Sequence, residues 1–142
     1  MAVLDVKHEE TASLLEELPG EGHLCVTGNA GVEEDVRSFA EKVLECFGRV
    51  DVLVNNACIT RRGILSGCSF EEFNEVLRVG VSAPYLLSLL FRDHFSRGAS
   101  IVNIASTRAS MSQKDTESYM CHGLPIKDET LCEMAERKAV AT

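Results

Sequence analysis

Residues 50–57, VDVLVNNA, form an apolar run whose side chains would be buried on both faces of a strand. Such strands are typical of a parallel sheet covered by helices on each side, because a sheet with one wet face alternates apolar and polar residues. The run SIVNIAS (100–106) has the same character, and shorter runs at 2–6 and 23–28 also predict strands. These four segments limit the chain to an α/β architecture.

The segments between these strands predict helices. Residues 9–18 end before a Pro-Gly pair, and residues 32–47 place apolar side chains at helical spacing. Gly48 follows at the position where a helix C-cap glycine belongs. Strands that alternate with helices in this way predict parallel βαβ units joined by right-handed crossovers.

A second helical region is expected between residues 69 and 95. Ser69 and Glu72 have the spacing of a capping box. Gly80 is expected to interrupt this helix, and Ser82 and Pro84 to begin another one through the leucine-rich cluster that follows. Most of that cluster is expected in the core, and part of it is a candidate oligomer face.

Composition excludes several classes of function. With 142 residues the chain has room for one domain, and its formal net charge of −8 argues against binding nucleic acid or an anionic membrane. No apolar run reaches the roughly 20 residues of a membrane span, and the acidic start is unlike a signal peptide, so a cytoplasmic location is expected. The six cysteines include no CxxC pair, so neither a disulfide framework nor a metal site is predicted.

Polar residues follow the points where the predicted strands end. In an open parallel sheet, ligands bind beyond the carboxyl ends of the strands, so these residues are candidates for a binding site. They are Asp5, Asn29, the group Asn55, Asn56 and Ala57, then Ser106, with Tyr119 thirteen residues after Ser106.

At this point the chain resembles the short-chain dehydrogenase/reductase family. VDVLVNNAC resembles the family's Asn-Asn-Ala-Gly motif with Cys58 in the place of the glycine, and SIVNIASTRASMSQKDTESY resembles its catalytic strand and loop. VLDV resembles the strand end whose acid holds the adenosine ribose. The resemblance covers residues 1–119, a partial Rossmann-like, doubly wound dinucleotide-binding domain, and leaves residues 120–142 as a divergent tail that is expected to be helical.

The resemblance implies a role for each candidate residue. Asp5 would bind the adenosine ribose, and its charge favours NAD over NADP because a carboxylate repels a 2′-phosphate. Asn29 would lie near the adenine, Ser106 would orient a carbonyl, and Tyr119 would act as the acid/base. A wall of the cofactor site would be formed by Asn55, Asn56 and Ala57.

The stretch VTGNAG (26–31) looks like a phosphate-binding loop, but its position argues otherwise. The family's glycine loop precedes the ribose acid by about 20 residues, whereas here Asp5 comes first. We therefore interpret Asn29 as the end of the family's third strand and Gly31 as part of a helix entry. It follows that the first βα unit and the C-terminal strands are expected to be missing.

The predicted function is NAD(P)-dependent hydride transfer between nicotinamide and a small-molecule alcohol or carbonyl. The family's Lys four residues after the Tyr is replaced by Gly123, and an Asn of its helix region by Gly80. This truncated chain is therefore expected to be inactive by itself. The alternative is a non-catalytic α/β interaction or regulatory module, and a homo-oligomer through the helices at 69–95 is a further expectation.

The missing first strand also makes a prediction about the sheet. In the order 3-2-1-4-5-6 that strand lies at the centre, so residues 2–6 and 50–57 would be left with unpaired edges. Two outcomes are open: direct pairing of these two segments in the order 3-2-4-5, or a gap that leaves both edges bare or filled by another chain. We expect direct pairing, since unpaired backbone groups are costly when buried.

Overall fold

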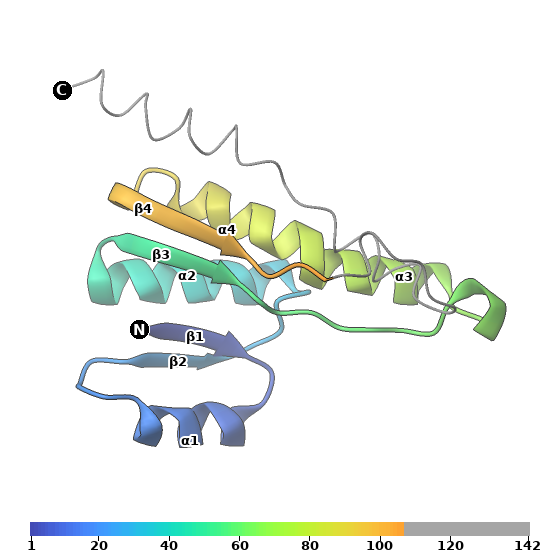
Figure 1. The fold of residues 1–142 in the computed structure, drawn as a ribbon, viewed down its shortest axis with the longest axis horizontal. Helices are drawn as coiled ribbons and strands as arrows, with labels where there is room; N and C mark the ends of the chain where they lie inside the picture. The colour runs from blue at the N-terminus through green and yellow to red at the C-terminus, as the bar shows by residue number, and fades with distance from the viewer. Residues whose placement is uncertain (107–142) are drawn as a thin grey trace.

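A computed structural model describes residues 1–106 of the chain, and Figure 1 shows parallel strands with helices packed on them. The alternation of strands and helices confirms the doubly wound α/β class. In chain order the elements are β1 (Ala2–Asp5), α1 (His8–Glu17), β2 (Leu24–Thr27), α2 (Glu33–Phe47), β3 (Val50–Asn55), the 3₁₀ turn η1 (Ile64–Ser66), α3 (Phe70–Leu77), the π-helical turn η2 (Arg78–Ser82), α4 (Ala83–Phe91) and β4 (Phe95–Asn103).

The strands form two separate parallel pairs, so the predicted direct closure of the sheet is wrong. β1 pairs with β2, with Val3 opposite Cys25. β3 pairs with β4, with Leu53 opposite Ile101 and Val54 opposite Val102. Within residues 1–106 no ladder joins β1 to β3, although Figure 1 shows these two strands next to each other and pointing the same way.

Packing on α2 explains why the two pairs stay apart. The buried face of α2 belongs to one core cluster with Val26 of β2 and Leu53 of β3, and Leu4 of β1 packs against the same cluster. Side chains of α2 thus hold both strand pairs from one side. Bringing β1 into hydrogen-bonding distance of β3 would pull one pair off this helix and lose buried apolar contact.

The two pairs differ in the covering of their other face. Cys25 of β2 points away from α2, and its sulfur lies 3.5 Å from the carbonyl oxygen of Thr11, which is buried in α1. Helices therefore cover both faces of the first pair. On the second pair, Val52 and Val54 are 56% and 55% exposed, so within the described chain the face opposite α2 and α4 is bare.

The predicted helix ends are confirmed. The Ser69 hydroxyl accepts the backbone N–H of Glu72 at 3.1 Å, and the Glu72 carboxylate accepts that of Ser69 at 2.8 Å, which completes the capping box. Gly48 ends α2 with φ of 69°, a left-handed conformation that glycine adopts without a steric cost. Its N–H donates to the carbonyl of Leu44 at 2.9 Å.

The interruption of the helix that Gly80 predicts does not occur. The chain passes from α3 through the π-helical turn η2 directly into α4, so Gly80 lies inside a wider helical turn. Leu87 and Phe91 of α4 are buried in the core as predicted, while Tyr85 and Leu89 remain exposed. No helix of the described part of the chain combines the length and apolar character needed to cross a bilayer.

β4 begins at Phe95, five residues before the predicted start at Ser100. The reason is a contact with β3, since the N–H of Val50 donates to the carbonyl of His94 at 2.9 Å. The Ser96 hydroxyl donates to the Asp51 carboxylate at 2.6 Å and lowers the pKa of that carboxyl. The sequence pattern around residues 95–99 gives no sign of these partners in β3, which lie more than 40 residues earlier in the chain.

Candidate cofactor site

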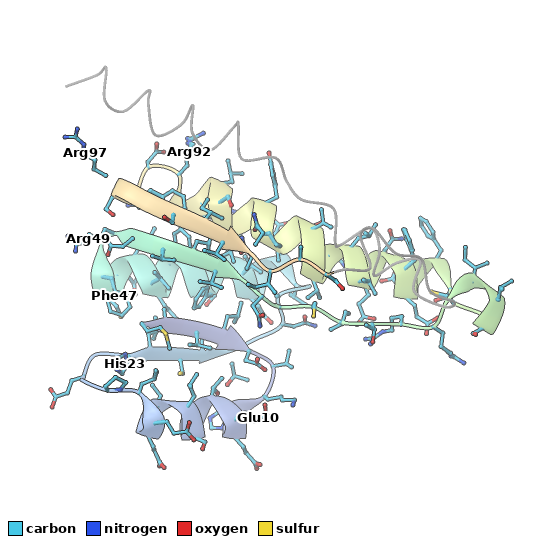
Figure 2. All side chains as sticks on the ribbon, viewed as in Figure 1. Glu10, His23, Phe47, Arg49, Arg92 and Arg97 are labelled. Carbon is cyan, nitrogen blue, oxygen red and sulfur yellow. The ribbon has the colours of Figure 1, made fainter. Side chains whose placement is uncertain are left out.

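All four strands point in one direction, so their carboxyl ends meet the solvent at one edge of the fold (Figure 1). Figure 2 shows that Arg49, Arg92 and Arg97 lie at the opposite, amino-terminal end of β3 and β4. The predicted polar residues therefore gather at an edge from which these cations are remote. In parallel sheets this is the edge that binds ligands.

Asp5 is the last residue of β1 and is exposed. One carboxylate oxygen accepts the backbone N–H of Lys7 at 2.9 Å, which holds the turn into α1. The Lys7 ammonium binds Glu10 at 2.6 Å, and this pairing raises the pKa of Lys7. Asp5 thus stands at the strand end as predicted, with a backbone contact at one of its two oxygens.

Asn29 follows β2 and is half-buried. Its side-chain oxygen accepts the N–H of Gly31 at 2.8 Å, and its own N–H donates to the Asp35 carboxylate at 2.8 Å. These two bonds fold residues 28–32 into a turn that leads into α2. Its predicted contact with adenine stays a prediction, and sequence analysis missed the supporting role of Asp35.

The two glycines of the VTGNAG stretch are required by packing. A Cβ on Gly28 would lie 3.0 Å from Leu4, and a Cβ on Gly31 would lie 3.0 Å from Val79 in η2. Both distances are tighter than ordinary van der Waals contact. Packing alone thus accounts for these glycines, which supports interpreting the stretch as a turn against a helix rather than a phosphate loop.

Asn55 ends β3 and is joined to β4 at this edge. Its side-chain nitrogen donates to the side-chain oxygen of Asn103 at 2.8 Å, and the two residues are opposite each other in the ladder. Asn103 was not among the predicted site residues. The sequence does contain a pattern that marks Asn103, because VLVN (52–55) and SIVN (100–103) both end an apolar run in Asn. Only the register of β3 and β4 shows that the two side chains meet.

The remaining predicted residues are partly described. Asn56 and Ala57 are exposed directly after β3, and Ser106 is half-buried three residues after β4. Tyr119 and Gly123 lie outside the described residues, as do the predicted domain boundary at 119 and the tail 120–142. The predicted pairing of Ser106 with Tyr119 therefore stays a prediction.

Ion pairs fasten the loop that follows Ala57 to α3. Arg61 forms two bonds of 2.8 Å with the carboxylate of Glu75, a bidentate contact that raises the pKa of Arg61. Arg62 lies 3.8 Å from Glu72. The Ser69 N–H lowers the pKa of Glu72, with a smaller contribution from the Ser69 hydroxyl. These two ion pairs thereby connect the loop that follows Ala57 to α3.

Two other kinds of site can be compared with this edge. A hollow of about 230 Å³ lies around η1, between Ile64 and Phe73, away from the strand ends. Across residues 1–106, no three side chains of His, Cys, Asp or Glu gather as a metal site. The strand-end edge brings together polar groups of β1, β2, β3 and β4.

The fold defines the class, a doubly wound, Rossmann-like α/β protein. The chain belongs to the short-chain dehydrogenase family, whose model matches residues 1–122. The predicted membership of that family is confirmed.

Individual relatives agree with this membership. An uncharacterized oxidoreductase of Thermotoga maritima is 37% identical over 116 residues, which cover 78% of this chain and 45% of the relative. An apo SCOR enzyme from Clostridium thermocellum superposes with a TM-score of 0.79 at 38% identity, over 86% of this chain and 50% of that one. A short chain dehydrogenase from Burkholderia cenocepacia in complex with NADP gives 0.74 at 26% identity, over 86% and 51%. The chain spans about half the length of the curated relatives it matches.

Proposed function

We propose that this chain carries the adenosine side and one wall of a nicotinamide dinucleotide site, in an oxidoreductase that acts on an alcohol or a carbonyl. The observation that carries this proposal is the gathering of Asp5, Asn29 and Asn55 at one edge of parallel strands. The NADP complex of the Burkholderia cenocepacia relative supports the class of cofactor.

The residues present fit such a cofactor. Asp5 has a second carboxylate oxygen for the ribose hydroxyls, because the Lys7 N–H binds only one of the two. Asn55 is fixed by Asn103, so the main chain that continues into Asn56 has a defined direction along the site. The side-chain oxygen of Asn29 is already bonded in its turn, which leaves its amide group as the donor for an adenine.

NAD is the proposed form of the cofactor. The carboxylate of Asp5 would repel the 2′-phosphate of NADP and accept hydrogen bonds from the two ribose hydroxyls of NAD. The NADP-bound relative is 26% identical, so it supports the fold and the cofactor class more than the choice between the two forms. A direct comparison of NADH with NADPH decides this point.

The catalytic roles follow from chemistry. The nicotinamide supplies the hydride, and a hydroxyl from Ser106 would orient the carbonyl oxygen of the substrate. Tyr119 would move the proton on that oxygen, which requires a pKa lowered from about 10 toward neutrality. Gly123 stands where the family has the ammonium that lowers it, so we expect no measurable turnover from this chain alone.

Binding of the cofactor is tested by following backbone amides during NMR titrations of the 142-residue chain with NADH and NADPH. We expect shifts at Asp5 and Asn29 with a dissociation constant for NADH on the order of 1 mM, which is about 4 kcal/mol. Asp5→Asn should weaken NADH binding about tenfold, since it removes a charged hydrogen-bond partner. NADPH should bind the unaltered chain more weakly than NADH.

Glu41→Gln is the matched control, because Glu41 is exposed on α2 and loses the same charge. It should leave the affinity for NADH unchanged. Micromolar binding would show that a phosphate loop has been overlooked in this chain. If the amides at the strand ends do not shift in millimolar NADH, the chain is instead a non-catalytic interaction module.

A further inference from the structure

Asp35 accepts a hydrogen bond from a residue outside its own helix. It is the third residue of α2, and its carboxylate accepts the N–H of Asn29, six residues earlier, at 2.8 Å. The residue at the N-cap of α2 is Val32, which has no polar side-chain atom. Asp35 therefore holds the chain segment that leads into the helix.

The charge of Asp35 does not by itself explain its position. Acidic side chains in a first helical turn interact favourably with the helix dipole, but Glu33 and Glu34 already supply two such charges in this turn. Glu33 binds Arg37 at 2.7 Å, and Glu34 is exposed. The bond to the main chain of Asn29 distinguishes Asp35 from these two glutamates.

The side chain of Asp35 also lies beside Gly28. A Cβ on Gly28 would lie 3.3 Å from the Cβ and 3.4 Å from the Cγ of Asp35. The N–H of Gly28 donates to the carbonyl of Asp5 at 2.9 Å, which joins the end of β2 to the end of β1. Asp35 therefore stands where the chain passes from the candidate ribose acid to the candidate adenine donor.

Two hydrogen bonds fix the conformation of Asn29. Its main-chain N–H is bound by Asp35, and its side-chain oxygen accepts the N–H of Gly31 at 2.8 Å. The side-chain nitrogen is therefore the group of Asn29 that is left to donate to a base. A donor that is fixed before the ligand arrives loses less conformational entropy on binding than one that the ligand must order.

We propose that Asp35 is a positioning residue for the adenine of the nicotinamide dinucleotide, and that it acts through Asn29. Its carboxylate holds the main chain of Asn29, so that the side-chain amide can donate to a ring nitrogen of the base. Asp35 itself makes no contact with the cofactor. This inference rests on the proposed function, and it adds a residue that determines how tightly the adenine is bound.

The test measures the affinity of the folded 142-residue chain for NADH, from the shift of the Asp5 amide in NMR titrations. Asp35→Ala and Asn29→Ala should each weaken binding about fivefold, the effect of one hydrogen bond. The double variant should bind no more weakly than Asn29→Ala, because Asp35 acts through Asn29. Asp35→Asn should bind NADH at least as tightly as the wild type, since its side-chain oxygen can accept the same N–H.

Glu34→Ala is the matched control, because it removes the same charge from the same turn of α2, and it should leave the affinity for NADH unchanged. Asp35→Ser, whose hydroxyl ends one bond short of the carboxylate oxygens, replaces Asp35→Ala if that variant does not fold. Wild-type affinity in the variant that folds, or a further fivefold loss in the double variant, would overturn this inference and leave the proposed function standing. If the wild type does not bind NADH, both are wrong.

Discussion

At the scale of single residues, short hydrogen bonds decide where the chain turns. Asn29 and Asp35 close the turn after β2, and Asn55 with Asn103 joins the ends of β3 and β4. Asn29, Asn55 and Asn103 stand at strand ends, and Asp35 lies in the first turn of α2. The same residues that offer a ligand polar groups therefore also hold the edge in shape.

The charge of Glu72 gives a prediction at this scale. Its folded pKa is lowered by the Ser69 N–H, so its stabilising effect is complete above the ordinary pKa of about 4.3 and is lost as the pH falls through the folded value. Glu72→Gln keeps an acceptor for Ser69 but removes the charge. Urea denaturation should show the wild type more stable than this variant near neutral pH, with the difference shrinking as the pH falls below the ordinary pKa of the carboxyl.

Glu41→Gln provides the comparison for the loss of one exposed charge, since Glu41 lies on α2 away from any capping box. The difference in free energy of unfolding between Glu41→Gln and the wild type should not show the pH dependence expected for Glu72→Gln. A stability difference for Glu72→Gln that stays the same from neutral to acid pH would contradict the capping role of the carboxylate.

At the scale of elements, the π-helical turn and the turn after β2 depend on each other. Val79 is buried in η2, and it lies where a side chain on Gly31 would have to go. The wider turn of a π-helix brings Val79 to this position, and π-helical turns are frequent near functional sites. The contact connects the end of β2 with the helix that runs into α4.

Gly31→Ala tests this contact. The added Cβ would lie 3.0 Å from Val79 and 3.2 Å from the side-chain oxygen of Asn29. We expect the free energy of unfolding to fall by about 1–3 kcal/mol, as for other overpacked positions. Thermal or urea denaturation measures the loss.

In the double variant Gly31→Ala with Val79→Ala, the smaller side chain makes room for the new Cβ. The loss of unfolding free energy in the double variant should therefore be smaller than the sum of the two single losses. The two changes would then be non-additive. Additive losses would show that Gly31 is required for another reason, such as the conformation of the Asn29 turn.

At the scale of the whole molecule, the two strand pairs contribute unequally to the core. Val26 is the buried core residue of β1 and β2, whereas α2, β3 and α4 supply most of the others. Asp5 and Asn29 belong to the pair with the smaller buried contribution. The proposed cofactor contacts at these residues would therefore lie on the part of the fold with fewer buried apolar side chains.

Native-state hydrogen exchange measures this difference. The amide of Val26 should exchange through an opening of lower free energy than that of Leu53, because fewer buried apolar side chains are exposed when β1 and β2 open. Exchange of both amides through one global opening would contradict the division of the molecule into two units of different stability.

Local features of the fold were predictable from the sequence. The helix of α2 with its Gly48 cap and the capping box of Ser69 and Glu72 follow from residues near each other in the chain. The parallel direction of the strands follows from their alternation with helices. Backbone sterics and short hydrogen bonds act over a few residues, so their patterns can be read directly. Candidate site residues could likewise be named wherever a strand ends.

Only the tertiary structure decided what distant segments do to each other. The start of β4 at Phe95, the bond between Asn55 and Asn103, and the open edges of β1 and β3 all depend on partners far along the chain. Val26 of β2 and Leu53 of β3 share one core cluster with the buried side chains of α2, and contacts between segments so far apart have no local pattern. The sequence by itself therefore determined the elements and the family, and tertiary packing determined which strands pair and which edges remain open.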